Sequence, residues 1–173
     1  MAADWRIEPL KQAHDRGGFD CGEAALDEYL RRYARQNQDS GIARTFVAVG
    51  SAEPGRVIGY YSVAVGVIDR ANLPAQAAKR FPRFPVPVAR IGRLAVDRAM
   101  QGQGLGEDLL MDALRRSLRA AAEVGIVAVL IDAKHERAKR FYARYEFEAL
   151  PDQPLTLWLP IQVVRRLFPA ALR

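Results

Sequence analysis

A glycine-rich turn past the middle of the chain is the feature that most constrains its fold. Residues 93–97 read Arg-Leu-Ala-Val-Asp, which is typical of the end of a strand, and residues 101–106 read Gln-Gly-Gln-Gly-Leu-Gly. A long amphipathic helix is predicted from about Gly104 to Ala122. A strand that enters a helix through glycines directs backbone N–H groups outward at the positive end of the helix dipole. The sequence therefore predicts a phosphate or pyrophosphate site at this turn.

The residues around the turn narrow the kind of phosphate ligand. A P-loop requires Lys and then Ser or Thr after its last glycine, whereas Glu107 and Asp108 follow here. A dinucleotide-binding fold places such a turn after the first strand of a parallel sheet, but this turn follows a predicted hairpin. A glycine turn that only begins a helix is the structural alternative.

The remaining pattern predicts a mixed α/β fold in a single domain over residues 1–173. Strands are predicted at Trp5–Ile7, Ala43–Val49, Val57–Val67, Val88–Val96, Ile126–Ile131 and within Glu148–Leu159. Helices are predicted at Gly22–Gln38, with Asp20 as its cap, and at Ala75–Arg80, Gly104–Ala122, Glu136–Tyr145 and Ile161–Arg173. Strands and helices in this order predict a central mixed sheet with helices on its faces.

Composition limits the chemistry and the location. The net charge of +6 and the sequence pI of about 9.8 favour anionic partners, although an Arg- and Ala-rich chain is also what a GC-rich genome encodes. Cys21, His14 and His135 are too few and too scattered for a metal site or a His-based triad. No apolar run spans a membrane and no signal peptide precedes the domain, so a cytoplasmic location is expected.

The turn resembles the pyrophosphate signature of the GNAT family of N-acetyltransferases, Gln/Arg-x-x-Gly-x-Gly/Ala. Gln101, Gly104 and Gly106 match that signature at the right spacing. The family also has a Phe-Tyr pair on a later helix, matched by Phe141 and Tyr142. A glycine usually precedes the phenylalanine that comes next, and this chain has Glu146 instead, where we expect a local adjustment of the backbone.

The resemblance implies the GNAT fold and acetyl-CoA as co-substrate, without a metal. It assigns the cofactor to the turn, to Phe141 and to the strand before the turn. The implied cofactor-binding residues are Leu94, Ala95, Val96, Gln101, Gly102, Gln103, Gly104, Leu105, Gly106 and Phe141.

The expected reaction is direct attack of an amine on the thioester carbonyl. An α-amino group, with a pKa of about 7.7–8.0, is partly neutral at working pH and needs little help from a base, whereas a lysine amine needs more. The departing thiolate needs a proton, for which the resemblance and the chemistry of a phenol both indicate Tyr142. Tyr145 is the alternative donor, and a packing role is the alternative for Tyr142.

A narrower resemblance rests on residues 19–22, 26–30, 59–61 and 92–97 together, and it is to the acetyltransferase toxins of type II toxin–antitoxin systems. It implies acetylation of aminoacyl-tRNA, which blocks translation. It also implies a homodimer, a ribbon-helix-helix antitoxin, and operator DNA bound through the toxin–antitoxin complex. Arg93 and, more weakly, Arg90 are candidates for binding a tRNA phosphate or the antitoxin, with surface ion pairs as the alternative.

Two other functions remain open from sequence. An acetyltransferase for a small amine or a protein N-terminus shares the cofactor turn but needs no basic surface. A non-catalytic module that senses acetyl-CoA keeps the turn but displaces Tyr142 from the thioester.

Overall fold

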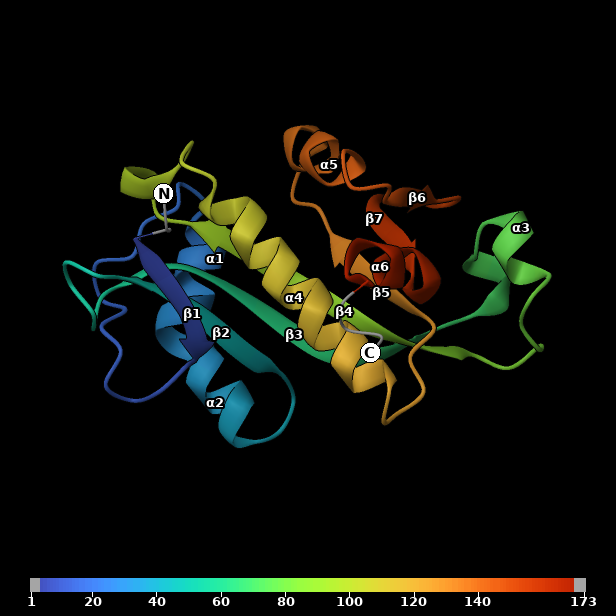
Figure 1. Cartoon of the computed structure of the whole chain (residues 1–173), viewed down its shortest axis with the longest axis horizontal. Coiled ribbons are helices and arrows are strands. Elements are labelled where there is room, and N and C mark those ends of the chain that lie inside the picture. The colour runs from blue at the N-terminus through green and yellow to red at the C-terminus, as the bar shows by residue number, and fades with distance from the viewer. Residues whose placement is uncertain (1–3, 170–173) are drawn as a thin grey trace. The chain divides into compact units, whose positions relative to one another are not determined.

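The computed structural model describes residues 4–169 and contains a mixed β-sheet flanked by helices (Figure 1). Its strands are hydrogen-bonded in the order β1-β2-β3-β4-β5-β7-β6. They are β1 (Trp5–Pro9), β2 (Arg44–Gly50), β3 (Val57–Ile68), β4 (Val86–Val96), β5 (Ala128–Asp132), β6 (Glu148–Leu150) and β7 (Gln153–Pro160). The helices are α1 (Ala24–Glu28), α2 (Ala34–Asp39), α3 (Ala75–Ala78), α4 (Leu105–Ala121), α5 (Glu136–Ala143) and α6 (Ile161–Leu167).

The chain divides into two compact units. Unit 1 comprises Met1–Ala64 and Gly92–Ala113, and unit 2 comprises Val65–Ile91 and Leu114–Arg173. The strands β3 and β4 and the helix α4 each contribute residues to both.

The strands β1, β2 and β3 form an antiparallel meander in unit 1. Ile7 lies opposite Ala48, and Val47 lies opposite Tyr60. The apolar, β-branched and aromatic residues that predicted a hairpin therefore form one, and β1 adds a third strand to its edge.

Successive residues of β3 show which helix covers which face of unit 1. Side chains alternate between faces along a strand. The Tyr60 hydroxyl donates to the carbonyl of Leu26 in α1 at 2.6 Å, whereas the neighbouring Tyr61 hydroxyl donates to Asp112 in α4 at 2.6 Å. The helices α1 and α2 therefore cover one face of this part of the sheet and α4 covers the other, as the fold class requires.

The helix predicted over Gly22–Gln38 is interrupted. A π-helical turn at Tyr29–Tyr33 separates α1 from α2. The extra residue of a π turn rotates the next helical segment about its axis, which hydrophobic spacing alone does not register. Asp20 is not the helix cap: its carboxylate accepts from the N–H of Gly22 at 3.0 Å, within its own loop, and Glu23 begins the helix without a side-chain cap.

Unit 2 contains the parallel part of the sheet. The strand β4 pairs with β5 in parallel, with Val88 opposite Ala128, and β7 pairs antiparallel with both β5 and β6. Sequence predicted one strand within Glu148–Leu159, and the structure has two, because the turn after Leu150 reverses the chain. The predicted tail helix ends at Leu167, and its residues 170–173 lie outside the described residues.

Gly59 on β3 lets the strand and α4 pack closely in unit 1. A Cβ at this position would lie 3.0 Å from Leu109, 3.1 Å from Leu105 and 3.3 Å from the carbonyl oxygen of Ala95. We expect Gly59→Ala to lower the free energy of unfolding by about 1–3 kcal/mol, because overpacked cores shift or strain their neighbours. Urea unfolding measures the change. Gly55→Ala, whose Cβ meets nothing within 4 Å, is the control, and equal midpoints for the two variants would contradict the packing argument.

Among residues 4–169, none of the helices combines the length and the apolar character that a membrane crossing requires.

Candidate active site

The turn between β4 and α4 begins at a buried carboxylate. Asp97 follows the last residue of β4, and its Oδ1 accepts from the N–H of Ala99 at 3.0 Å. Its Oδ2 accepts from the N–H of Asp20 at 3.2 Å, so the same side chain joins the turn to the loop before α1. Asp97 therefore acts as a turn-forming residue, the role that its position after the strand favours over a catalytic one.

Gln101 supports the turn with its side-chain amide. Its Nε2 donates to the carbonyl oxygens of Val96 at 2.9 Å and Cys21 at 3.0 Å. Both amide hydrogens are thereby engaged, and the remaining polar atom of the side chain is an acceptor. Gln101 thus supports the shape of the turn, and its side chain has no N–H left to offer a ligand.

Gly102 and Gly104 give that main chain its shape. Their φ angles are +80° and +91°, in the region that glycine adopts without steric cost. A Cβ added at either position would meet nothing within 4 Å, so the space beside the backbone is open. An anion has room to approach the backbone here.

The helix α4 supplies N–H groups directed at the same place. Leu105 begins the helix and is 1% exposed, which anchors its first turn in the core. Gly106 lies in that first turn, where N–H groups have no acceptor within the helix. Gln103 is exposed, and its Nε2 donates to the carbonyl of Ala99 at 3.4 Å. The predicted turn residues therefore lie together in unit 1 at the start of α4.

The end of β4 leads into the turn. Ala95 is buried in the unit 1 core, whereas Leu94 and Val96 are partly exposed. The carbonyl of Val96 already accepts from Gln101, so this main-chain group serves the turn.

Arg93 is held by an aromatic face. Its guanidinium carbon lies 3.7 Å from the centroid of the Tyr29 ring, and no carboxylate within the described residues pairs with it. The Tyr29 hydroxyl contacts Ser62 at 3.2 Å and accepts from Asn37 at 3.3 Å, which fixes the ring. The surface ion pair considered from sequence is absent from the described part of the chain, and a cation–π contact takes its place.

Arg90 does form an ion pair, in unit 2. Its Nε and Nη2 donate to the two carboxylate oxygens of Asp132, each at 2.7 Å, and Thr156 donates to the same carboxylate at 3.3 Å. This bidentate geometry occupies the fork of Arg90. Of the two arginines singled out by sequence, Arg93 is the one whose charge is not neutralised by a carboxylate in the described residues.

The helix α5 in unit 2 carries Tyr142. The ring of Tyr142 packs edge-on against Phe141 and Phe147, with centroids 5.2 Å and 6.1 Å away. The Tyr142 hydroxyl has no hydrogen-bond partner within the described residues. Every fully buried polar side-chain atom of these residues does have a partner, so the hydroxyl oxygen is not fully buried. The ring is therefore buried while the hydroxyl still reaches solvent. Burial raises the pKa of Tyr142 above the ordinary value of a phenol.

The N-terminus of α5 is capped by His135, whose Nδ1 accepts from the N–H of Ala138 at 3.1 Å. Sequence leaves this histidine open as a cap, a site-lining residue or a solvated side chain, and the structure shows a cap whose side chain is exposed. Phe141 is half-buried, and its ring contacts Tyr145 at 5.5 Å.

Glu146 keeps the left-handed conformation that glycine usually supplies after this helix. Its φ is +69°, the one positive value at a non-glycine residue in the described chain. The expected local adjustment of the backbone does not occur: the chain retains the geometry and accepts the steric cost, about 1–2 kcal/mol for an L-residue.

We therefore expect Glu146→Gly to raise the free energy of unfolding by about 0.5–1 kcal/mol, the steric relief less the entropy that glycine adds to the unfolded chain. Thermal and urea unfolding measure it. Glu146→Gln removes the charge and keeps the strain, so it should give no such gain. Equal stabilisation by both variants would trace the effect to charge and contradict this account.

The surroundings of Cys21 and His14 indicate structural roles for both side chains. Burial, together with the hydrogen bond to Asp27, raises the pKa of Cys21 to about 12, so its thiolate is scarce at neutral pH. His14 Nε2 lies 2.6 Å from Glu8 Oε1. Within residues 4–169, no group of His, Cys, Asp and Glu side chains is placed to hold a metal ion.

Asp27, which lies within the stretch 26–30 of the narrower resemblance but was given no role of its own, supports the turn indirectly. It is 6% exposed, and its Oδ1 accepts from the N–H of Cys21 at 2.9 Å. Cys21 in turn offers its carbonyl to Gln101. No local sequence pattern indicates this supporting role of Asp27. The role becomes clear only once the loop before α1 is known to contact the turn.

Comparison with known proteins identifies the class. Residues 41–149 match the model of the acetyltransferase (GNAT) domain, and the chain therefore belongs to the GNAT acetyltransferase family. It is 41% identical over 158 residues to the "tRNA-acetylating toxin" of Mycobacterium tuberculosis (strain ATCC 25618 / H37Rv), covering 91% of this chain and 93% of that one.

Solved structures of similar proteins share the fold. A Tyr-to-Phe mutant of KacT superposes with a TM-score of 0.91 at 32% identity and covers 96% of this chain and 100% of its own. AtaT complexed with acetyl-methionyl-tRNAfMet superposes with a TM-score of 0.88 at 31% identity, covering 95% and 99%. The GNAT fold predicted from the turn and the Phe-Tyr pair is thereby confirmed.

Proposed function

We propose that this chain is a toxin that transfers the acetyl group of acetyl-CoA to the α-amino group of aminoacyl-tRNA and so blocks translation in the cytoplasm. The observation that carries the proposal is the 41% identity to a tRNA-acetylating toxin over nearly the whole of both chains. The cofactor turn, with its open backbone and helix start, supplies the physical basis. In this proposal residues 1–173 act as one catalytic domain.

The turn would hold the pyrophosphate of acetyl-CoA. The N–H groups from Gly102 to Gly106 would donate to it, with Gln101 as their support. The strand end Leu94–Val96 would face the pantetheine arm, and Phe141 would contribute an apolar surface. A solved structure of the AtaT complex with its antitoxin contains acetyl-CoA, which supports the same co-substrate here.

The proposed reaction has one bond-forming and one bond-breaking step. The neutral amine nitrogen attacks the thioester carbonyl carbon, a C–N bond forms, and the C–S bond then breaks. The nitrogen loses a proton and the sulfur gains one. Tyr142 would donate to the sulfur as negative charge develops there. Because its pKa is raised, the phenol stays protonated at working pH, so its donor form is always present.

The pH dependence tests this assignment. We expect kcat/KM to rise with pH up to the amine pKa of about 7.7–8.0 and then to level off, because only the neutral amine attacks. A raised phenol pKa means that the protonated form extends to higher pH, so no falling limb is expected below about pH 9. Initial rates between about pH 6 and 9 measure the profile, and a fall at the upper end of that range would contradict Tyr142 as the donor.

The partners are inferred from the same relatives. AtaT is solved bound to the C-terminus of its antitoxin AtaR, and a KacTA complex is solved with DNA. We infer that this chain pairs with an antitoxin of the ribbon-helix-helix type, forms a homodimer, and reaches operator DNA through the complex. The unneutralised guanidinium of Arg93 is our candidate for an anionic group of the tRNA or of the antitoxin.

The testing experiment measures transfer from labelled acetyl-CoA to aminoacylated total tRNA. Deacylated tRNA and tRNA carrying an N-formylated amino acid are the controls, because neither offers a free α-amine. Label that depends on the free amine supports the proposal. Label on small amines or protein N-termini but not on tRNA would mean that those amines, and not aminoacyl-tRNA, are the substrate. Acetyl-CoA binding without any transfer would indicate a sensing module.

A further inference from the structure

The stretch from Arg70 to Phe84 in unit 2 is basic and free of acidic residues. It contains Arg70, Lys79, Arg80 and Arg83, and the next acidic residue after Asp69 is Asp97. We call residues 70–84 the basic segment.

The basic segment is fixed to unit 2 by an apolar inner side. Leu73 is 3% exposed, and Ala77 and Phe81 pack with it against the core that contains Val86 and Trp158. The Phe81 and Trp158 rings meet edge-on, with centroids 6.5 Å apart. The segment is therefore a built surface whose shape does not depend on a ligand.

Arg70 and Arg80 lie on this frame with partners of their own. Arg70 Nε donates to the carbonyl of Ala78 at 2.7 Å, which closes the loop around α3. Arg80 Nη1 donates to Gln162 of α6 at 3.1 Å. Neither bond neutralises a charge, because both acceptors are neutral.

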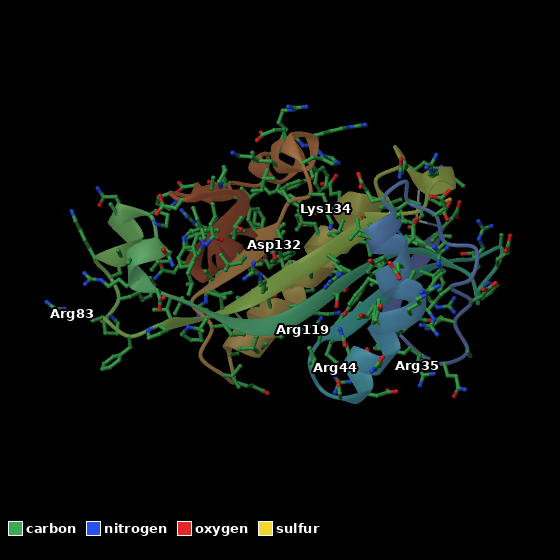
Figure 2. The ribbon with its side chains drawn as sticks, turned by 180° about the vertical axis from the view of Figure 1, so that it is seen from behind. Arg35, Arg44, Arg83, Arg119, Asp132 and Lys134 are labelled. Carbon is green, nitrogen blue, oxygen red and sulfur yellow. The ribbon has the colours of Figure 1, made fainter. Side chains whose placement is uncertain are left out.

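Lys79 and Arg83 are exposed, and their side chains have no partner among the described residues. Figure 2 shows Arg83 at the outer edge of the loop between α3 and β4, with its side chain directed away from the chain. An open cavity of about 520 Å³ beside it is lined by Arg70, Arg83, Leu73 and Pro151 among others, and both charges of its lining are positive.

Phe84 adds an aromatic face to the same edge. It is 75% exposed, the highest value among the large hydrophobic side chains of the described chain. An exposed aromatic ring next to unpaired cations is a composition that suits a nucleic acid, whose phosphates pair with the cations and whose bases stack on the ring.

Acidic groups lie on the other side of α3. A second cavity, lined by Arg80 and Arg166, also contains Glu146 and Glu148. Binding of an anionic polymer is therefore more favourable along Lys79, Arg83 and Phe84 than across the second cavity, where carboxylates repel it.

We propose that the basic segment binds the RNA backbone of the tRNA substrate, with Lys79 and Arg83 on phosphates and Phe84 against a base. The inference rests on the proposed function for the identity of the RNA. Glu146, which follows α5 and its Tyr142, lines the same second cavity as Arg80, so the segment and the end of α5 lie near one another in unit 2.

The experiment measures binding of wild type and of the double variant Lys79→Gln/Arg83→Gln to uncharged total tRNA over a range of KCl. We expect the double variant to bind at least about tenfold more weakly than wild type. The slope of log Kd against log [KCl] should fall by about 1.5, because each lost phosphate contact lowers that slope by about 0.7–0.9. Phe84→Leu should weaken binding about threefold to tenfold and leave the slope unchanged. Both substituted cations are exposed, so unchanged melting temperatures are expected.

The matched control is Lys11→Gln/Arg119→Gln, which removes two exposed cations elsewhere and should leave the slope unchanged. Equal losses in both double variants would show a general charge effect and overturn the inference, as would a double variant that binds like wild type. In steady-state acetylation, the basic-segment variant should raise the KM for aminoacyl-tRNA without changing the KM for acetyl-CoA. If wild type binds tRNA through the segment but transfers no acetyl group, the proposed function fails and this inference stands.

Discussion

Tyr142→Phe is expected to lower kcat for acetyl transfer to aminoacyl-tRNA by about 10²–10³-fold, the range typical of losing one positioned proton donor. The substitution removes the hydroxyl and keeps the ring that packs on Phe141 and Phe147. The hydroxyl has no partner within the described residues, so its loss leaves no buried group unsatisfied and should not lower stability. Single-turnover rates with labelled acetyl-CoA measure the effect directly.

Tyr145→Phe is the matched control for this prediction. Tyr145 lies about one turn further along the chain, its ring also contacts Phe141, and sequence alone left it as an alternative donor. We expect this variant to retain kcat within about threefold of wild type, because solvent and Tyr142 would still supply the proton. If Tyr145→Phe is the variant that loses activity, the two roles exchange, and if both retain it, proton donation comes from solvent.

The second large effect is expected at the cofactor turn. Gly104→Ala should raise the Kd for acetyl-CoA by about 30–100-fold, which corresponds to losing one charge-assisted hydrogen bond worth about 1.5–3 kcal/mol. A residue that carries a Cβ is strained at a φ of +91°. The backbone of the turn therefore shifts, and its N–H groups no longer point at one place. Isothermal titration calorimetry measures the Kd.

Gly41→Ala controls for the strain itself. Gly41 lies beyond α2, has a φ of +80°, and likewise has nothing within 4 Å of an added Cβ. Both variants should lose similar stability, about 1 kcal/mol. Only Gly104→Ala should weaken acetyl-CoA binding, so a similar Kd change in Gly41→Ala would mean that the effect is global destabilisation.

The glycine turn before α4 could be located from sequence because its determinants are local. Glycines, a preceding strand and a subsequent helix are all visible as neighbouring residues, and φ angles of +80° and +91° at Gly102 and Gly104 are what glycine permits. The support for the turn was not visible. Asp27 and Cys21 lie many residues away, and no local pattern shows that their loop contacts Gln101.

The two candidate arginines show the same limit. In sequence, Arg90 and Arg93 are cations on one predicted strand, and the ranking of Arg93 above Arg90 shows a partner for neither. In the structure Asp132, on the neighbouring strand β5, neutralises Arg90 at 2.7 Å, whereas Arg93 rests on the ring of Tyr29. Which cation keeps its charge available depends on partners that only strand pairing and helix packing bring near.

The fold class, the glycine turn before α4 and the place of Tyr142 on a helix could be predicted from the order of the amino acids, because periodicity, glycine content and the Phe-Tyr pair are properties of consecutive residues. The break in the first helix, the split of the last strand and the left-handed geometry kept at Glu146 arise only in the folded chain. So does the choice of which side chains are neutralised, since ion pairing and burial depend on distances between residues far apart in the sequence. Long-range packing overrides local preference where the two conflict, and Glu146 retains the strain of that conflict.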